Sequence, residues 1–246
     1  MHSLNTLAPG VHTFDATQRF LGLELGARMT VLQLRDGLLV HSPIGVSPSV
    51  LEHLGTPRWV LAPNLFHHLY IGPWIDAGLD GWGAPGLPDK RSDVQFEGVV
   101  SSGTSPFGDE VETYVLRCFS MTNEVLLLHK RSRTLLVSDL VFNISASAPW
   151  MTRVAMRCLG GYPGCAVTLL ERVAMRRDLA REDLAKIANW DFDRVVMAHG
   201  DVIETGGKQA LLRAFRWLSL PALPEAGNRA PAQPCPKRGA PHDEEP

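Results

Sequence analysis

The sequence of 246 residues lacks the marks of several large classes of protein. Its four cysteines show neither a Cys-x-x-Cys pair nor the spacing of a disulfide framework, so we expect reduced thiols. No run of about 18 apolar residues free of charge is present, and the first residues lack the basic start and apolar run of a secretory signal. We therefore expect a cytoplasmic protein with no transmembrane segment.

An excess of charge of either sign is also missing. The chain has 24 Lys and Arg against 26 Asp and Glu, a net charge of -2, so its overall field offers nothing to attract nucleic acid. Neither a Walker-type phosphate loop nor a Gly-x-Ser-x-Gly elbow occurs, so nucleotide-binding proteins and serine hydrolases lack their signatures. We expect no nucleic-acid partner.

The composition changes at Ser219. Residues 219–246 hold seven of the 18 prolines, and Leu220 and Leu223 are their only bulky aliphatic residues. Such a segment buries too little apolar surface to order itself. We predict one folded domain over residues 5–218 and a disordered tail, rich in Pro and Ala, over residues 219–246.

Strands and helices alternate along the predicted domain, which indicates a layered α/β fold. Residues 28–35 alternate between apolar and polar, and Asp36-Gly37 is a hairpin turn signal before a partner strand over 38–41. The remaining patterns predict strands over 58–62, 113–117, 125–129, 134–137 and 194–198, and helices over 47–54, 151–159, 165–177, 181–189 and 204–218.

Polar side chains follow three of these predicted strands. His67 and His68 follow the strand over 58–62, Asp139 follows the apolar Leu135-Leu-Val-Ser, and His199 follows the last strand. Imidazoles and carboxylates are ligands of zinc and iron, and loops at strand ends bring side chains into one pocket. The pattern favours a metal site, although loop histidines can simply be solvent-exposed and Asp139 can cap a helix.

Three segments resemble, in the same order, the metal-bearing segments of the metallo-β-lactamase superfamily: Trp59-Val-Leu-Ala-Pro-Asn-Leu-Phe-His-His68, Thr134-Leu-Leu-Val-Ser-Asp-Leu-Val-Phe-Asn143 and Val195-Val-Met-Ala-His-Gly200. More closely, the chain resembles an uncharacterised group of bacterial and plant proteins in that superfamily, which shares the Asn-x-x-His-His motif of residues 64–68. This resemblance implies a four-layer αβ/βα sandwich with a metal site at the edge between two sheets. It implies no particular substrate.

The chain departs from the superfamily's usual His-x-His-x-Asp-His motif. With the last histidine placed on His68, the aspartate position becomes His67 and the first two histidines become Pro63 and Leu65. Ser120 stands where a further histidine belongs. The resemblance therefore implies a single site for one divalent metal, zinc first, with iron or manganese as alternatives, on His67, His68, Asp139 and His199.

Three further residues are candidates for the pocket. Asn64 either donates a hydrogen bond into the site or forms an Asx turn after Pro63. His41 lies where the superfamily places a bracing aspartate, so it is a structural hydrogen-bonding group or, alternatively, a metal ligand. Asn143 either lines the pocket or caps a loop.

These residues predict a metal-dependent hydrolase acting on an unidentified small molecule. Four protein ligands would close a tetrahedral zinc site, so Asp139 or His67 would then act outside the coordination shell, as hydrogen-bond partner or general base. Two alternatives stay open: a non-catalytic metal-binding or interaction domain, and an iron-dependent redox protein. Residues 151–177 are either a core-packed helical hairpin or an apolar, arginine-flanked element that touches a membrane surface or covers a hydrophobic substrate.

Overall fold

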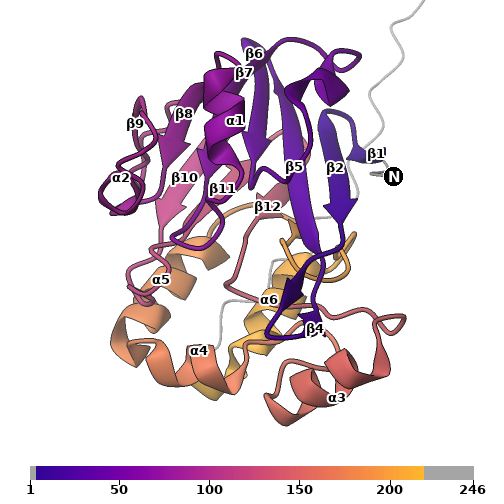
Figure 1. Ribbon diagram of the computed structural model, residues 1–246. Coiled ribbons are helices and arrows are strands. Elements are labelled where there is room, and N and C mark those ends of the chain that lie inside the picture. Colours follow the sequence, from indigo (N-terminus) through magenta and orange to yellow (C-terminus); the bar gives the residue numbers. More distant parts are fainter. Residues whose placement is uncertain (1–3, 219–246) are drawn as a thin grey trace, which may run out of the picture.

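The computed structural model describes residues 4–218, in which two large β-sheets face each other, with helices on their outer sides (Figure 1). The larger sheet has the strand order β1-β2-β5-β6-β7-β8-β9. Its strands are β1 (Leu4–Ala8), β2 (Val11–Ala16), β5 (Ala27–Leu34), β6 (Gly37–His41), β7 (Pro57–Ala62), β8 (Asp80–Gly83) and β9 (Gly98–Val99). A short hairpin, β3 (Arg19–Phe20) and β4 (Leu23–Glu24), leaves the sheet between β2 and β5.

The predicted hairpin is confirmed as β5 and β6, which pair antiparallel with Thr30 opposite His41. The turn chemistry explains its register, because Gly37 has a φ of 140° that disfavours other residues. β6, β7 and β8 are then parallel to one another. The end of β6, the end of β7 and the start of β5 consequently lie at the same edge of the sheet.

The smaller sheet has the order β10-β11-β12-β13, and its last two strands are parallel. Its strands are β10 (Val111–Val115), β11 (Val125–His129), β12 (Thr134–Leu136) and β13 (Arg194–Val196). β11 and β12 are entirely buried, as expected for strands covered on both faces. The ends of β12 and β13 lie together and carry the loops that contain Asp139 and His199.

Three apolar layers hold the fold together and confirm the predicted four-layer αβ/βα sandwich. The layer between the sheets is built from side chains of both, including Leu32, Leu39, Leu61, Leu127, Leu136 and Val196. A second layer packs the smaller sheet against α5 (Arg177–Ala188), α6 (Gly207–Ala214) and η2 (Arg216–Leu218). A third packs the larger sheet against η1 (Pro48–Leu51), α1 (Ile71–Asp76) and α2 (Leu87–Lys90).

The helices differ from their prediction most between residues 150 and 190. α3 (Trp150–Cys158) agrees with it, but the helix expected over 165–177 is only α4 (Leu169–Ala174), and α5 begins four residues earlier than expected. The break has a packing cause: Met175 adopts an extended conformation and inserts its side chain into the core beneath the smaller sheet. Local propensity over 165–177 is overridden by this tertiary contact.

The helices predicted at 47–54 and 204–218 are shorter in the structure. The first is the 3₁₀ turn η1, and the second begins only at Gly207, because Gly206 has a φ of 68°. Within residues 4–218, no helix combines the length and the apolar character that crossing a bilayer requires. The predicted tail over 219–246 lies outside the described residues.

Candidate metal centre

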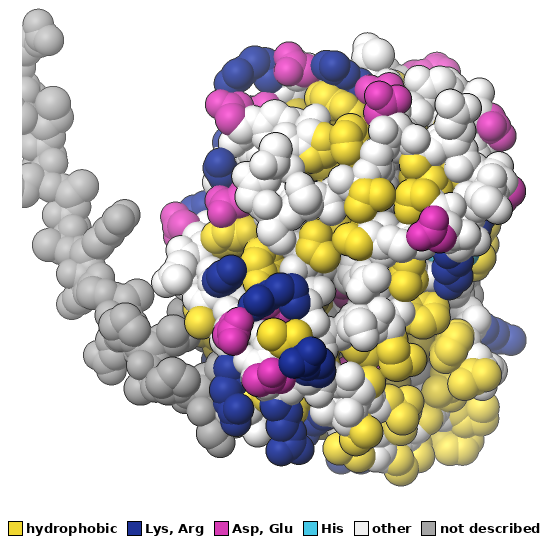
Figure 2. Space-filling model, turned by 90° about the vertical axis from the view of Figure 1, so that its left-hand side faces the viewer, with side chains coloured by type: hydrophobic (Ala, Val, Ile, Leu, Met, Phe, Trp, Pro, Cys, Tyr) yellow, Lys and Arg dark blue, Asp and Glu magenta, His cyan; other side chains and the backbone are white. Residues whose placement is uncertain are grey.

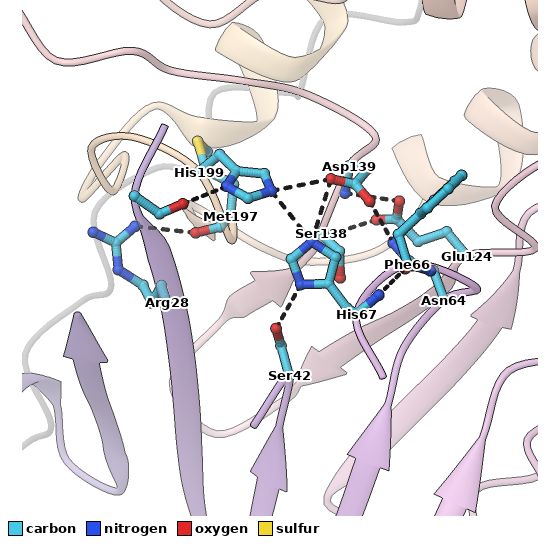
Figure 3. Close-up of polar contacts among 11 residues, drawn as sticks. Arg28, Ser42, Asn64, Phe66, His67, Glu124, Ser138, Asp139, Met197 and His199 are labelled. Atoms are coloured by element: carbon cyan, nitrogen blue, oxygen red, sulfur yellow. Dashed lines mark hydrogen bonds and ion pairs between the residues drawn. The ribbon is translucent and has the colours of Figure 1, made fainter. Parts of the chain in front are cut away.

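Loops from both sheets bring His67, Asp139 and His199 together, and we call these three residues the His–Asp–His cluster (Figure 3). His67 Nε2 lies 3.2 Å from His199 Nε2 and 3.4 Å from Asp139 Oδ1. The third side, from His199 Nε2 to Asp139 Oδ1, is 3.3 Å. The structure thus brings together three of the four metal ligands expected from the sequence.

The donor triangle has the size and chemistry of a zinc coordination face. Ligand atoms that surround tetrahedral zinc at bond lengths of about 2.0–2.1 Å lie about 3.3 Å from one another. The three sides of this triangle are 3.2, 3.3 and 3.4 Å. Two imidazole nitrogens and one carboxylate oxygen also suit several divalent ions. The residues present therefore fit one divalent metal ion.

Each imidazole is oriented by a partner on its far nitrogen. His199 Nδ1 lies 2.7 Å from the carbonyl oxygen of Gly26, which only accepts, so Nδ1 carries a proton and Nε2 faces the cluster, where it can bind a metal once it is deprotonated. His67 Nδ1 lies 2.8 Å from Ser42 Oγ. Such outer partners fix the ring and its tautomer at metal sites. The ring of Phe142 also stacks on His199 with 5.8 Å between centroids.

Asn64 connects the loop of His67 to Asp139. Its Oδ1 accepts hydrogen bonds from the backbone N–H groups of Phe66 and His67, both at 2.8 Å, and this is the Asx turn that the sequence suggested. Its Nδ2 donates to Asp139 Oδ2 at 2.8 Å, so the same side chain also acts in the site. Asn64 is fully buried.

Glu124, which the sequence analysis missed, holds the Asp139 loop from below. Its carboxylate accepts the backbone N–H groups of Ser138 at 2.6 Å and Asp139 at 2.9 Å. Burial, together with the nearby charge of Asp139, raises the pKa of Glu124 to about 8. A lone glutamate before a strand gives no signal in a sequence, because the backbone groups that it contacts belong to a distant segment.

The charges of the cluster balance one another. Burial opposes ionisation of Asp139, but the charge of His67 and hydrogen bonds from His199 and His67 hold its pKa well below the usual range. Burial likewise opposes protonation of His199, and the hydrogen bond and charge of Asp139 outweigh it and raise the pKa of His199. A bound cation would replace the protons on His67 and His199 as the positive charge beside the Asp139 carboxylate.

The loop that carries His199 is fixed by backbone contacts. Arg28 on β5 donates to the carbonyl oxygens of Met197 at 3.0 Å and Gly200 at 2.7 Å. Gly200 has a φ of 92°, and a Cβ there would lie 2.1 Å from the carbonyl oxygen of Asn143. The Asn143 side chain donates to the carbonyl oxygen of Asp201, so in the structure it caps this loop instead of lining the cavity.

Two of the predicted histidines lie outside the cluster. His68 accepts a hydrogen bond at Nδ1 from Arg91 at 3.1 Å, and burial and the charges of Lys90 and Arg91 lower its pKa. His41 is 2% exposed, and burial followed by the charge of His67 lowers its pKa to about 3. The hydrogen bond to His67 is made by the neighbour of His41, Ser42, which was not predicted from the sequence.

The cluster opens into a cavity of about 710 Å³. All three of its side chains line this cavity, together with His68 and residues of the β3–β4 hairpin, the loop after β7 and α4. Ser120, in place of the superfamily's histidine, is exposed and does not line it, although its neighbours Phe119 and Met121 do. His68 is outside the cluster and its Nδ1 is bonded to Arg91, so three of the four expected metal ligands come together at the cavity wall.

The fold of the chain is that of metallo-β-lactamases of known structure. Solved structures that align with the chain include a metallo-β-lactamase from Erythrobacter litoralis with β-mercaptoethanol in its active site, with a TM-score of 0.67 and 11% identity over 89% of this chain and 96% of the other. Another is FIM-1 from Pseudomonas aeruginosa in a mono-zinc form, with a TM-score of 0.63 and 8% identity over 89% and 97%.

A third, from Pontibacter korlensis, has a TM-score of 0.61 and 11% identity over 89% and 99%. At such identities the likeness establishes the fold and leaves the activity to be argued from the site. No protein-family model and no curated protein matches the sequence.

Proposed function

We propose that the protein is a mononuclear metal-dependent hydrolase whose ion is held by His67 Nε2, Asp139 Oδ1 and His199 Nε2. The observation that carries this proposal is the donor triangle with sides of 3.2–3.4 Å on the wall of a cavity. Catalytic zinc sites commonly have three protein ligands and one open position, whereas four protein ligands are typical of structural sites. The Asn-x-x-His-His motif, in which Asn64 positions both His67 and Asp139, also supports grouping the chain with the uncharacterised bacterial and plant proteins that it resembles.

A divalent ion at this place would polarise a carbonyl or phosphoryl group and lower the pKa of water. The protein's own residues supply the remaining functions. Asp139 is ionised at neutral pH, because its pKa lies well below the usual range, so its Oδ1 would offer the ion a negatively charged ligand atom. Asn64 keeps this carboxylate in place, and Ser42 and Gly26 keep the two imidazoles aligned.

A screen of esters, thioesters and phosphodiesters with protein reconstituted with zinc, iron or manganese tests this proposal. We expect one substrate class to be cleaved, with a loss of kcat/KM of at least about 100-fold in His199→Ala and Asp139→Asn, because each variant loses a metal ligand or its charge. His53→Ala, which alters an exposed histidine away from the cluster, serves as the matched control and should retain activity. Cleavage that survives in His199→Ala would contradict the proposal.

The donor set also favours a second candidate function. Two histidines and one carboxylate with an open side form the facial ligand set of non-haem iron(II) oxygenases. An iron-dependent redox protein would retain iron when purified without oxygen and would consume oxygen only with iron bound. The zinc-loaded protein would then be inactive in every hydrolysis assay.

A further inference from the structure

Exposed apolar side chains are concentrated around the mouth of the cavity. In the described part of the chain, thirteen large hydrophobic side chains are exposed. Six of them line the cavity: Phe20, Phe66, Leu69, Tyr70, Met121 and Leu170. Six others lie on the β3–β4 turn, α3 and α4, and only Val99 is on a distant strand. Figure 2 shows hydrophobic side chains gathered at the lower right of the molecule, and α3 and α4 lie in the lower part of the ribbon in Figure 1.

The interior of the cavity is equally apolar. Leu25, Pro43, Ile44, Phe119 and Phe142 belong to its wall, and Lys90 is the single Lys or Arg among the residues that line it. The other acidic residue besides Asp139 is Glu171, whose carboxylate is hydrogen-bonded by Thr168 and whose pKa is raised by burial. A second hollow of about 810 Å³ over β10 and α5 is lined instead by polar and charged residues such as Glu112, Lys130 and Lys186.

We propose that the cavity binds the hydrocarbon chain of an amphiphilic acyl ester or thioester and so places the acyl bond at the His–Asp–His cluster. This inference rests on the proposed hydrolase function. A volume of about 710 Å³ accommodates a chain of this kind, since pockets for small ligands are commonly about 300–1,000 Å³. Large exposed apolar patches in soluble proteins mark binding surfaces.

The reaction balances with water as the only co-substrate. The bond between the acyl carbon and the ester oxygen or thioester sulfur breaks, and a new bond forms between that carbon and the oxygen of water. One proton of water passes to the leaving alcohol or thiol, and the other product is the carboxylic acid. The apolar wall contributes to binding in proportion to the methylene groups that it removes from water.

Displacement of dansylundecanoic acid from the metal-free protein tests the substrate class separately from hydrolysis. We expect the affinity of the competitors butanoate, hexanoate, octanoate and decanoate to rise up to about fourfold per methylene group. Leu170→Glu, on the cavity wall, should weaken probe binding at least about tenfold, and so should Met121→Glu. Val173→Glu is the matched control, because Val173 lies on the same helix, is 87% exposed and does not line the cavity.

Two versions of this experiment distinguish where the hydrocarbon chain of the ligand comes from. The dissolved probe reports a free amphiphile, for which Val173→Glu should match the wild type. The same probe held in phosphatidylglycerol vesicles reports a membrane source, for which both Val173→Glu and Leu170→Glu should reduce transfer. Either source agrees with the proposal.

Affinity that does not depend on chain length, or Leu170→Glu and Met121→Glu variants that bind the probe like the wild type, would overturn it. So would conversion of a dimer to a monomer by Leu170→Glu with unchanged probe binding, because the surface would then be an interface between two copies. Probe binding that persists while no ester or thioester is cleaved would contradict the hydrolase function but would still support a binding site for a hydrocarbon chain in the cavity.

Discussion

At the scale of single residues, the candidate centre depends on side chains that hold its ligands more than on the ligands alone. Ser42, Asn64 and Glu124 each contact a ligand or the backbone beside it, at distances of 2.6–2.9 Å. Pre-organised outer contacts of this kind determine metal affinity and ring orientation. We therefore expect the site to be sensitive to substitutions at residues that do not bind the metal themselves.

Glu124 provides a test of this dependence. Glu124→Ala leaves two buried backbone N–H groups without an acceptor, and each such loss costs about 1–3 kcal/mol. We expect the free energy of unfolding in urea to fall by about 2–6 kcal/mol, and to fall less in Glu124→Gln, whose amide oxygen still accepts. Equal stability of the alanine variant and the wild type would show that Glu124 does not hold the loop.

His41 makes stability depend on pH. Its pKa is about 3 in the folded protein and 6.5 when unfolded, so the unfolded chain binds the proton first and stability falls as pH drops below 6.5. Between pH 8 and pH 5 this amounts to about 2 kcal/mol. In urea titrations with a chelator present, the free energy of unfolding of His41→Leu should fall by about 2 kcal/mol less between pH 8 and pH 5 than that of the wild type. The same pH dependence of stability in both proteins would contradict the lowered pKa of His41.

The residues of the cluster could be predicted from the sequence, whereas their partners could not. His67, Asp139 and His199 each follow an apolar strand, and that pattern is visible in the chain. Ser42 and Glu124 act on segments 25 and 14–15 residues away, so no local signal marks them. His68 matched the superfamily motif, yet its contact with Arg91 depends on the placement of α2, which the sequence analysis did not predict.

At the scale of elements, the site is an edge where parallel strands of two sheets end. The loop after β13 is the most constrained part of it, because Gly200 contacts Asn143 and the carbonyl oxygens of residues 197 and 200 bind Arg28. Packing of this kind allows a loop to hold a ligand in one orientation.

A substitution at Gly200 tests how closely this loop is packed. Gly200→Ala adds both left-handed strain and a clash with the Asn143 carbonyl oxygen, so we expect a loss of at least about 3 kcal/mol in the free energy of unfolding. Gly164→Ala is the matched control, since Gly164 has a φ of 74° and a Cβ added there would meet no atom within 4 Å. Its loss should be only about 1 kcal/mol. Equal losses in the two variants would show that the loop tolerates a side chain.

The bounds of the predicted strands agree with the structure more closely than those of the predicted helices, for a physical reason, although β1, β2, β8 and β9 were not predicted. The β5–β6 hairpin has a local turn and local alternation, so its pattern determines its register. The helix expected over 165–177 instead breaks where Met175 enters the core, which depends on residues far along the chain. The core beneath the smaller sheet, not helix propensity, decides where α4 ends.

At the scale of the whole molecule, two sheets with helices outside them leave one edge where a polar cluster meets an apolar surface. The cluster supplies reactive groups, and the exposed hydrophobic side chains around it supply binding surface. A net charge of -2 gives no long-range steering of charged ligands, which agrees with a substrate recognised by its apolar part.

The central claim is that three residues, and not four, hold one metal ion. Elemental analysis of the purified, metal-reconstituted protein tests it most directly, with His67→Ala, Asp139→Ala, His199→Ala and His68→Asn compared side by side. The asparagine variant removes the imidazole of His68 and keeps an acceptor for Arg91. We expect about one metal ion per chain in the wild type and in His68→Asn, and a loss of that ion in the three alanine variants. Metal that disappears in His68→Asn but persists in His67→Ala, or a wild-type protein that binds none, would contradict the account.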